Sequence, residues 1–89
     1  MARHQPPKHK RNELKRIVLS VLENRGWLST PMIRHLAGWV WRRPLNYHLA
    51  RYQRWHLVKR KGTWNAKPIY WRLTREGEKK LAWLRRTMS

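Results

Sequence analysis

The balance of charged residues places the strongest constraint on how this chain folds. Its 89 residues include 22 Lys and Arg but only four Glu and no Asp, so the formal net charge is +18. Such a chain repels itself, and it needs a polyanionic partner as well as apolar burial to offset that repulsion. Seven Trp, three Tyr and an apolar share of 40% supply the burial. Disorder over most of the length is therefore not expected.

The length predicts one domain with a small core. The chain has no cysteine, so neither a disulfide nor a thiolate zinc site is expected to stabilise it. Its apolar runs are too short and too often interrupted by charge for a membrane span. Residues 1–11 are basic and have no apolar stretch, so we expect a disordered tail rather than a signal peptide. The predicted domain covers residues 12–87.

A first helix is predicted from Asn12 to Arg25, with Asn12 as N-cap and Glu13 in the first turn. Gly26 is expected to end it. The apolar side chains that recur at helical spacing form one predicted buried stripe: Leu14, Ile17, Val18, Val21 and Leu22.

A short extended piece, Trp27 and Leu28, precedes a second helix that Thr30 is expected to cap, with Pro31 at its first position. Gly38 is expected to stop this helix. Its predicted buried face consists of Met32, Ile33, Leu36 and Ala37.

A turn at Trp39 and Val40 leads to a third predicted helix, from Trp41 or Arg42 to Trp55. Pro44 falls in its first turn, where a missing N–H costs little. At 100° per residue, one face of this helix carries Leu45, Leu49 and Tyr52. The opposite side carries Arg43, Tyr47, Ala50 and Arg54, flanked by Asn46 and Arg51.

Two strands follow, from Leu57 to Arg60 and from Ile69 to Leu73, and residues 61–67 are predicted to form a long hairpin loop between them. Thr74 is expected to cap a last helix that has Glu76 in its first turn. Leu81 and Leu84 should face inward. Among the tryptophans, core positions are predicted for Trp27, Trp55 and Trp71.

Three stretches in this order carry a resemblance to a known family: WLSTPMIRHLAG (27–38), RPLNYHLARYQRWHLVKR (43–60) and YWRLTREGEKKLAWL (70–84). The chain resembles the winged helix-turn-helix DNA-binding domains of small prokaryotic transcriptional regulators. The resemblance implies a mostly helical α+β fold, with a three-helix core, a β-hairpin wing and a C-terminal helix. The family usually has Gly where this chain has His56, so His56 is expected to adopt a left-handed conformation.

The predicted partner is double-stranded DNA, since an exposed basic helix of this size fits the major groove. In the resembling family the wing contacts the minor groove or the adjacent backbone, which basic side chains suit. The predicted DNA-binding residues are Arg42, Arg43, Asn46, Tyr47, Arg51, Arg54, Lys61, Trp64 and Lys67.

Two other readings of the sequence stay open: an RNA-binding, ribosome-associated winged-helix protein, and a protein-interaction or replication-assembly module. No enzyme is expected, because four scattered Glu do not supply the clustered carboxylates of a nuclease. No cofactor, metal or membrane partner is predicted. The protein is expected to bind DNA as a monomer or a homodimer.

Overall fold

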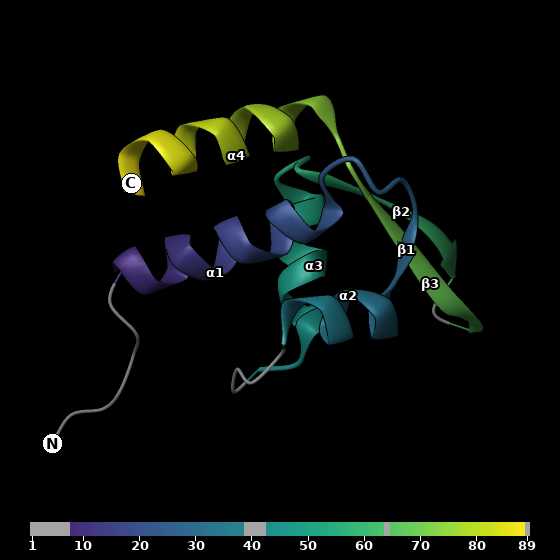
Figure 1. Ribbon diagram of the computed structural model, residues 1–89. Helices are drawn as coiled ribbons and strands as arrows, with labels where there is room; N and C mark the ends of the chain where they lie inside the picture. Colours follow the sequence, from purple (N-terminus) through teal and green to yellow (C-terminus); the bar gives the residue numbers. More distant parts are fainter. Residues whose placement is uncertain (1–7, 39–42, 64, 89) are drawn as a thin grey trace, which may run out of the picture.

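The computed structural model describes residues 8–38, 43–63 and 65–88, which form a mixed helical and antiparallel-sheet fold (Figure 1). The elements are α1 (Lys8–Leu22), β1 (Leu28–Ser29), α2 (Thr30–Ala37), α3 (Leu45–Arg54), β2 (Val58–Thr63), β3 (Ala66–Leu73) and α4 (Arg75–Met88). Among these described residues, no helix is both long enough and apolar enough to cross a bilayer.

Helix α1 begins and ends earlier than predicted. It starts at Lys8, so the expected tail of residues 1–11 was too long, and Asn12 lies inside the helix instead of capping it. Its first turn has no acidic residue, so the predicted dipole role of Glu13 was wrong. The helix ends at Leu22 because Asn24 adopts a left-handed φ of 60°, ahead of Gly26 at 71°.

The buried side of α1 is also wider than the predicted stripe. Leu14, Val18 and Leu22 are buried as expected, but Leu19 is fully buried as well, while Ile17 stays partly exposed. Helix α1 packs against both α2 and α4, and this accounts for a buried side wider than a single stripe.

Helix α2 is capped by Ser29 and not by Thr30. The Ser29 Oγ accepts a hydrogen bond from the N–H of Met32 at 3.3 Å, and Pro31 is the second residue of the helix, one position later than predicted. Gly38 ends the helix in the left-handed conformation, with φ of 60°, which confirms its predicted role. The predicted turn at Trp39 and Val40 lies outside the described residues.

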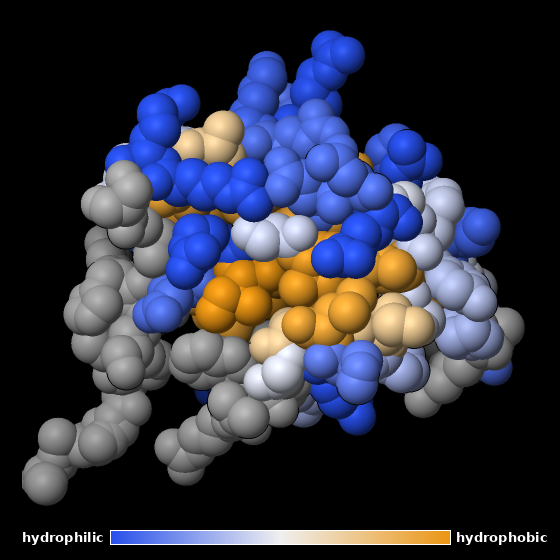
Figure 2. Space-filling view, in the orientation of Figure 1, coloured by the Kyte–Doolittle hydropathy of each residue, from blue (hydrophilic) through white to orange (hydrophobic). Residues whose placement is uncertain are grey.

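Only part of the predicted apolar face of α2 is buried. Ile33 is fully enclosed, but Met32 and Leu36 are 46% and 41% exposed, so their predicted burial was wrong. Met32 and Leu36 lie one helical turn apart on the same face of a short helix. Ile33, on another face, is the residue that packs into the core. Figure 2 shows hydrophobic surface on this face of the molecule, in the area where α1 and α2 lie in Figure 1.

The three strands form an antiparallel sheet in the order β1-β3-β2. Trp71, fully buried as predicted, lies in the central strand opposite Leu28 and Arg60. Strand pairing continues to Thr63 opposite Ala66, with an irregularity between Lys61 and Thr63. The predicted long loop over 61–67 is therefore wrong, because most of it is strand.

The connection from α3 to α4 is held by backbone and threonine contacts. His56 has a φ of 63°, which confirms its expected left-handed conformation. Thr74 Oγ1 donates to the His56 carbonyl at 2.6 Å and accepts from the Gly77 N–H at 2.9 Å, so Thr74 caps α4 as predicted. A Cβ on Gly77 would overlap the carbonyl oxygen of Leu57, so this close approach requires glycine.

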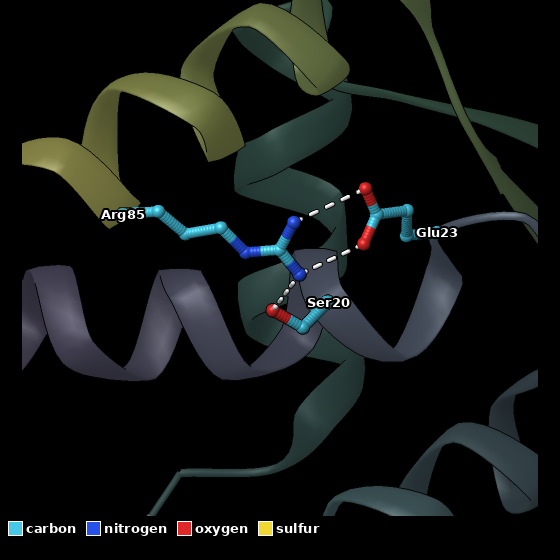
Figure 3. A network of polar contacts seen from close by, with 3 residues as sticks. All are labelled: Ser20, Glu23 and Arg85. Carbon is cyan, nitrogen blue, oxygen red and sulfur yellow. Dashed lines mark hydrogen bonds and ion pairs between the residues drawn. The ribbon is translucent and has the colours of Figure 1, made fainter.

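Helix α4 runs alongside α1 and closes the core (Figure 1). Leu81 and Leu84 are buried, as predicted. At the edge of this contact, the Arg85 guanidinium forms two hydrogen bonds with the Glu23 carboxylate, at 2.8 and 3.2 Å, and one with Ser20 Oγ at 3.3 Å (Figure 3). The arginine lowers the pKa of Glu23 by this hydrogen bonding.

Candidate nucleic-acid interface

The orientation of α3 is set by the side chains that it buries. Leu45 and Leu49 are fully buried and Tyr52 nearly so, which confirms the predicted inner face. Burial raises the pKa of the Tyr52 hydroxyl well above its ordinary value, so this phenol stays neutral within the core. With these three residues inward, the remaining sides of α3 face solvent.

The solvent side of α3 brings together most of the predicted recognition residues. The exposed side chains are Arg43, just before the helix, and Asn46, Tyr47, Arg51 and Arg54 within it. The helix contains no Asp or Glu, so no carboxylate on α3 repels an approaching polyanion. Two further predicted residues, Arg42 and Trp64, lie outside the described part of the chain.

Arginine and aromatic side chains alternate along this surface. The guanidinium carbon of Arg43 lies 4.7 Å from the ring centroid of Tyr47, and that of Arg51 lies 5.7 Å from the same centroid. Arg51 also donates a hydrogen bond to the Tyr47 hydroxyl at 3.4 Å. Tyr47, which is 39% exposed, therefore lies between two cations and orders both of them.

Trp55 extends this arrangement at the C-terminal end of α3. Its ring centroid lies 5.0 Å from the Arg51 guanidinium carbon, and it shares a shallow hollow with Tyr47, Ala50 and Arg54. Its side chain is 44% exposed, so the core position predicted for it was wrong. The helix ends one residue earlier and the left-handed His56 turns the chain, so that Leu57 fills the core instead.

His48 lies on α3 beside the recognition side, half-buried, with its ring centroid 5.3 Å from that of Tyr47 in an edge-to-face arrangement. Burial lowers the pKa of His48, and the positive charges of Arg51 and Arg43 lower it further. The imidazole is therefore held in its neutral form at neutral pH.

The hairpin presents its basic residues differently from the prediction. Lys61 belongs to β2, and its Nζ lies 5.2 Å from the ring centroid of Trp27 and 5.7 Å from that of Tyr70. Trp27 is accordingly partly exposed instead of forming core as predicted. Lys67 lies in β3 and not in a loop. Lys61 therefore extends from a paired strand, opposite Tyr70.

A like-charge pair faces outward on the same sheet. Lys59 lies directly opposite Arg72 in the strand register, and both side chains are exposed. Like charges placed opposite one another destabilise a sheet. Their repulsion would be relieved by an anion that contacts both side chains.

The described residues contain no group of three or more His, Cys, Asp or Glu side chains able to hold a metal ion. This surface carries guanidinium, ammonium and amide hydrogen-bond donors together with aromatic rings. Such groups bind phosphates and base edges.

Comparison with known proteins supports the fold and leaves the family unassigned. No family model matches the sequence, and no curated protein is significantly similar to it. Among solved structures, the chain resembles NadR in complex with 4-hydroxyphenylacetate, with a TM-score of 0.63 over 94% of this chain and 74% of that one. The fold is winged-helix-like. The sequence identity of 18% limits this likeness to the fold.

Proposed function

We propose that this chain binds double-stranded DNA, as a transcriptional regulator or a small architectural protein in the cytoplasmic nucleoid. In the proposed complex α3 enters the major groove, and the β2–β3 hairpin contacts the backbone or the minor groove. The protein acts as a monomer or a homodimer. The residues proposed to contact DNA are Arg42, Arg43, Asn46, Tyr47, Arg51, Arg54, Lys61, Trp64 and Lys67.

One observation supports the proposal. The exposed side of α3 carries arginine and asparagine side chains and no acidic residue, while the opposite side is buried in the core. A helix in this position fits the major groove. Arginine donates two hydrogen bonds to guanine, and asparagine pairs in the same way with adenine. Arg51 and Asn46 are therefore proposed as base-reading residues.

The proposal includes no catalytic activity. The sequence has four Glu and no Asp. Two of the four, Glu76 and Glu78, lie in the first turn of α4, where their negative charge interacts favourably with the helix dipole. A third, Glu23, is bonded to Arg85. Clustered carboxylates for metal-assisted phosphodiester hydrolysis are therefore not available from these three residues.

The decisive experiment is a salt titration of binding to genomic DNA fragments, run beside structured RNA of equal length. Contact with about 6–8 phosphates predicts that log K falls against log salt with a slope of about −5 to −7 on duplex DNA. A slope shallower than about −2 would show that the basic surface does not face the ligand. Tighter binding to structured RNA, with no protected site on DNA, would favour the RNA-binding alternative.

A further inference from the structure

A second basic hollow lies beyond the C-terminal end of α3 and adjoins the residues proposed to contact duplex DNA at Arg51. It is lined by Lys15 of α1, Lys80 of α4, and Trp55 and Leu57 of the connection between α3 and β2. Leu57 is buried and provides an apolar floor, while Trp55 is 44% exposed. We call this set of four residues the Trp55 hollow.

Both charged residues that line this hollow, Lys15 and Lys80, are positive. The Nζ of Lys15 lies 4.7 Å from the ring centroid of Trp55, and the Arg51 guanidinium carbon lies 5.0 Å from it. Burial lowers the pKa of Lys15, and the nearby charges of Lys80 and Arg51 lower it further. Two cations, Lys15 and Arg51, thus lie over one partly exposed indole, while Lys80 lines the hollow with its Nζ 4.4 Å from the ring centroid of Trp83. An anion entering the hollow would relieve the repulsion among these charges.

We propose that the Trp55 hollow binds an unpaired nucleotide of a nucleic-acid strand, with the base stacked on Trp55 and the adjacent phosphate held by Lys15 and Lys80. An aromatic ring beside lysines combines the two features by which proteins bind single strands: a stacking surface for the base and cations for the backbone. Double-stranded DNA does not offer a free base face to such a site, because its bases are stacked on one another.

The contacts of Trp55 in the free protein indicate how a base would enter. Lys15 and Arg51 lie over the indole, which remains 44% exposed. A base that stacks on the ring replaces one of these cations. The displaced side chain then pairs with the phosphate next to that base, so the cation–ring contact is exchanged for a charge–charge contact.

This inference goes beyond duplex binding and does not depend on it. Arg51 is the point where the two surfaces adjoin, since it contacts both Tyr47 and Trp55. A strand that leaves a duplex held on α3 would therefore meet the Trp55 hollow next. The experiment below uses single strands alone, so its outcome is separate from that of the salt titration on duplex DNA.

The test compares oligothymidylate with an abasic strand of equal length, which carries the same phosphates but no bases. Fluorescence anisotropy with labelled strands at fixed salt measures both affinities. Stacking of one base predicts that the intact protein binds oligothymidylate at least about fivefold more tightly. Trp55→Leu should bring the ratio close to one, and Trp55→Phe should retain part of the preference. Oligouridylate, measured in the same way, reports whether the strand can equally be RNA.

Two matched controls make the assignment specific. Trp83→Leu removes another tryptophan, 41% exposed on α4, which does not line the hollow but contacts Lys80 Nζ at 4.4 Å from its ring centroid. Because the phosphates are the same in both strands, loss of this contact should weaken both affinities alike and leave the ratio unchanged. Lys80→Gln should make the salt slope on oligothymidylate shallower by about 0.7, whereas Lys79→Gln, the neighbouring charge, should change it less. Circular dichroism and thermal melting confirm that each variant is folded.

The proposal is overturned if the intact protein binds abasic and base-bearing strands equally. It is also overturned if Trp83→Leu lowers the ratio as much as Trp55→Leu does, since stacking would then not be located in the hollow. Equal effects of Lys79→Gln and Lys80→Gln would remove the proposed phosphate contact.

Discussion

The indole Nε1 of Trp71 donates a hydrogen bond of 2.9 Å to the Oγ1 of Thr30, 41 residues earlier in the chain. Trp71 is completely buried in the central strand, and Thr30 is the first residue of α2. The bond allows a polar N–H to be enclosed in the core, because a buried donor without an acceptor is costly. It also ties α2 to the sheet and thereby helps to place the helices of the basic surface.

The first prediction concerns this bond. Thr30→Val keeps the shape of the side chain but removes the acceptor, so we expect it to lower the free energy of unfolding by about 1–3 kcal/mol. Urea denaturation followed by circular dichroism measures the change. Thr30→Ser retains the hydroxyl and should lose clearly less. A Thr30→Val protein as stable as the unaltered chain would mean that the hydrogen bond contributes nothing to folding.

Gly77 provides the second prediction. Because its Cβ position is occupied by the Leu57 carbonyl oxygen and approached by the Leu73 side chain at 2.7 Å, Gly77→Ala should force α4 away from the sheet. We expect a loss of about 1–3 kcal/mol in the free energy of unfolding, despite the higher helix propensity of Ala. Lys79→Ala, at an exposed position of the same helix, should stay within about 0.5 kcal/mol. Thermal melting of both proteins distinguishes these outcomes.

The pair of Lys59 and Arg72 provides the third prediction. Replacing Lys59 by Glu converts a repulsive cross-strand pair into an attractive one, so it should raise the free energy of unfolding by about 0.2–1 kcal/mol. Lys79→Glu makes the same change in net charge on α4, and the difference between the two variants isolates the pair. If both variants change stability equally in urea denaturation, only the net charge matters.

His48 predicts a dependence of stability on pH. Its pKa is lower in the folded protein than the ordinary 6.5 because of burial and the charges of Arg51 and Arg43. As the pH falls, the unfolded chain therefore takes up a proton first. The stability contributed by neutral His48 is complete above about pH 7 and is lost as the pH drops through the folded pKa.

The measurement for His48 is urea denaturation at several values between about pH 7.5 and 5.5, a range that brackets the ordinary histidine pKa. The unaltered protein should lose stability over this range, and His48→Gln should lose less. His35→Gln, which changes an exposed histidine on α2, serves as the control. An unchanged slope in His48→Gln would show that protonation of His48 is not linked to unfolding.

The sequence predicts the order and type of the elements and much of the core, because helical spacing and the alternation around Trp71 report directly which side chains turn inward. The sequence also predicts that Thr74 caps α4 and that Gly38 ends α2, because both features depend on local backbone chemistry. The features that the sequence does not predict depend on contacts between segments that are distant in the chain. Leu19 is buried because α4 packs on α1.

The residues of the candidate site likewise fall into two groups: those whose exposure the sequence predicts and those whose exposure it does not. The outward position of Asn46, Tyr47, Arg51 and Arg54 follows from helix geometry once the inner face is identified. The sequence predicts a core position for Trp55, whereas the turn at His56 places Leu57 inside instead. The spacing of residues along the sequence does not predict the Trp55 hollow, because the hollow combines residues of three separate segments.

The last prediction separates base reading from phosphate attraction on α3. The Arg51 guanidinium lies over the rings of Tyr47 and Trp55 and donates to the Tyr47 hydroxyl, so its planar group is oriented before any ligand binds. Lysine carries the same charge but lacks the paired donors that match guanine. Arg51→Lys should therefore reduce the preference for a selected binding site over random duplex by about 1–3 kcal/mol.

The salt slope of Arg51→Lys on random duplex should remain within about 0.5 of the original, since the number of phosphate contacts is unchanged. Arg54→Lys is the matched control: Arg54 is also exposed on α3 and shares the shallow hollow, but within the described part of the chain it has no hydrogen bond or ring contact with Tyr47. The site is first selected from a random duplex pool with the unaltered protein, and both variants are then titrated on it. If Arg54→Lys reduces the preference and Arg51→Lys does not, the reading residue is Arg54. If neither variant reduces it while the slope on random duplex stays steep, α3 binds phosphates and the sequence preference originates elsewhere on the protein.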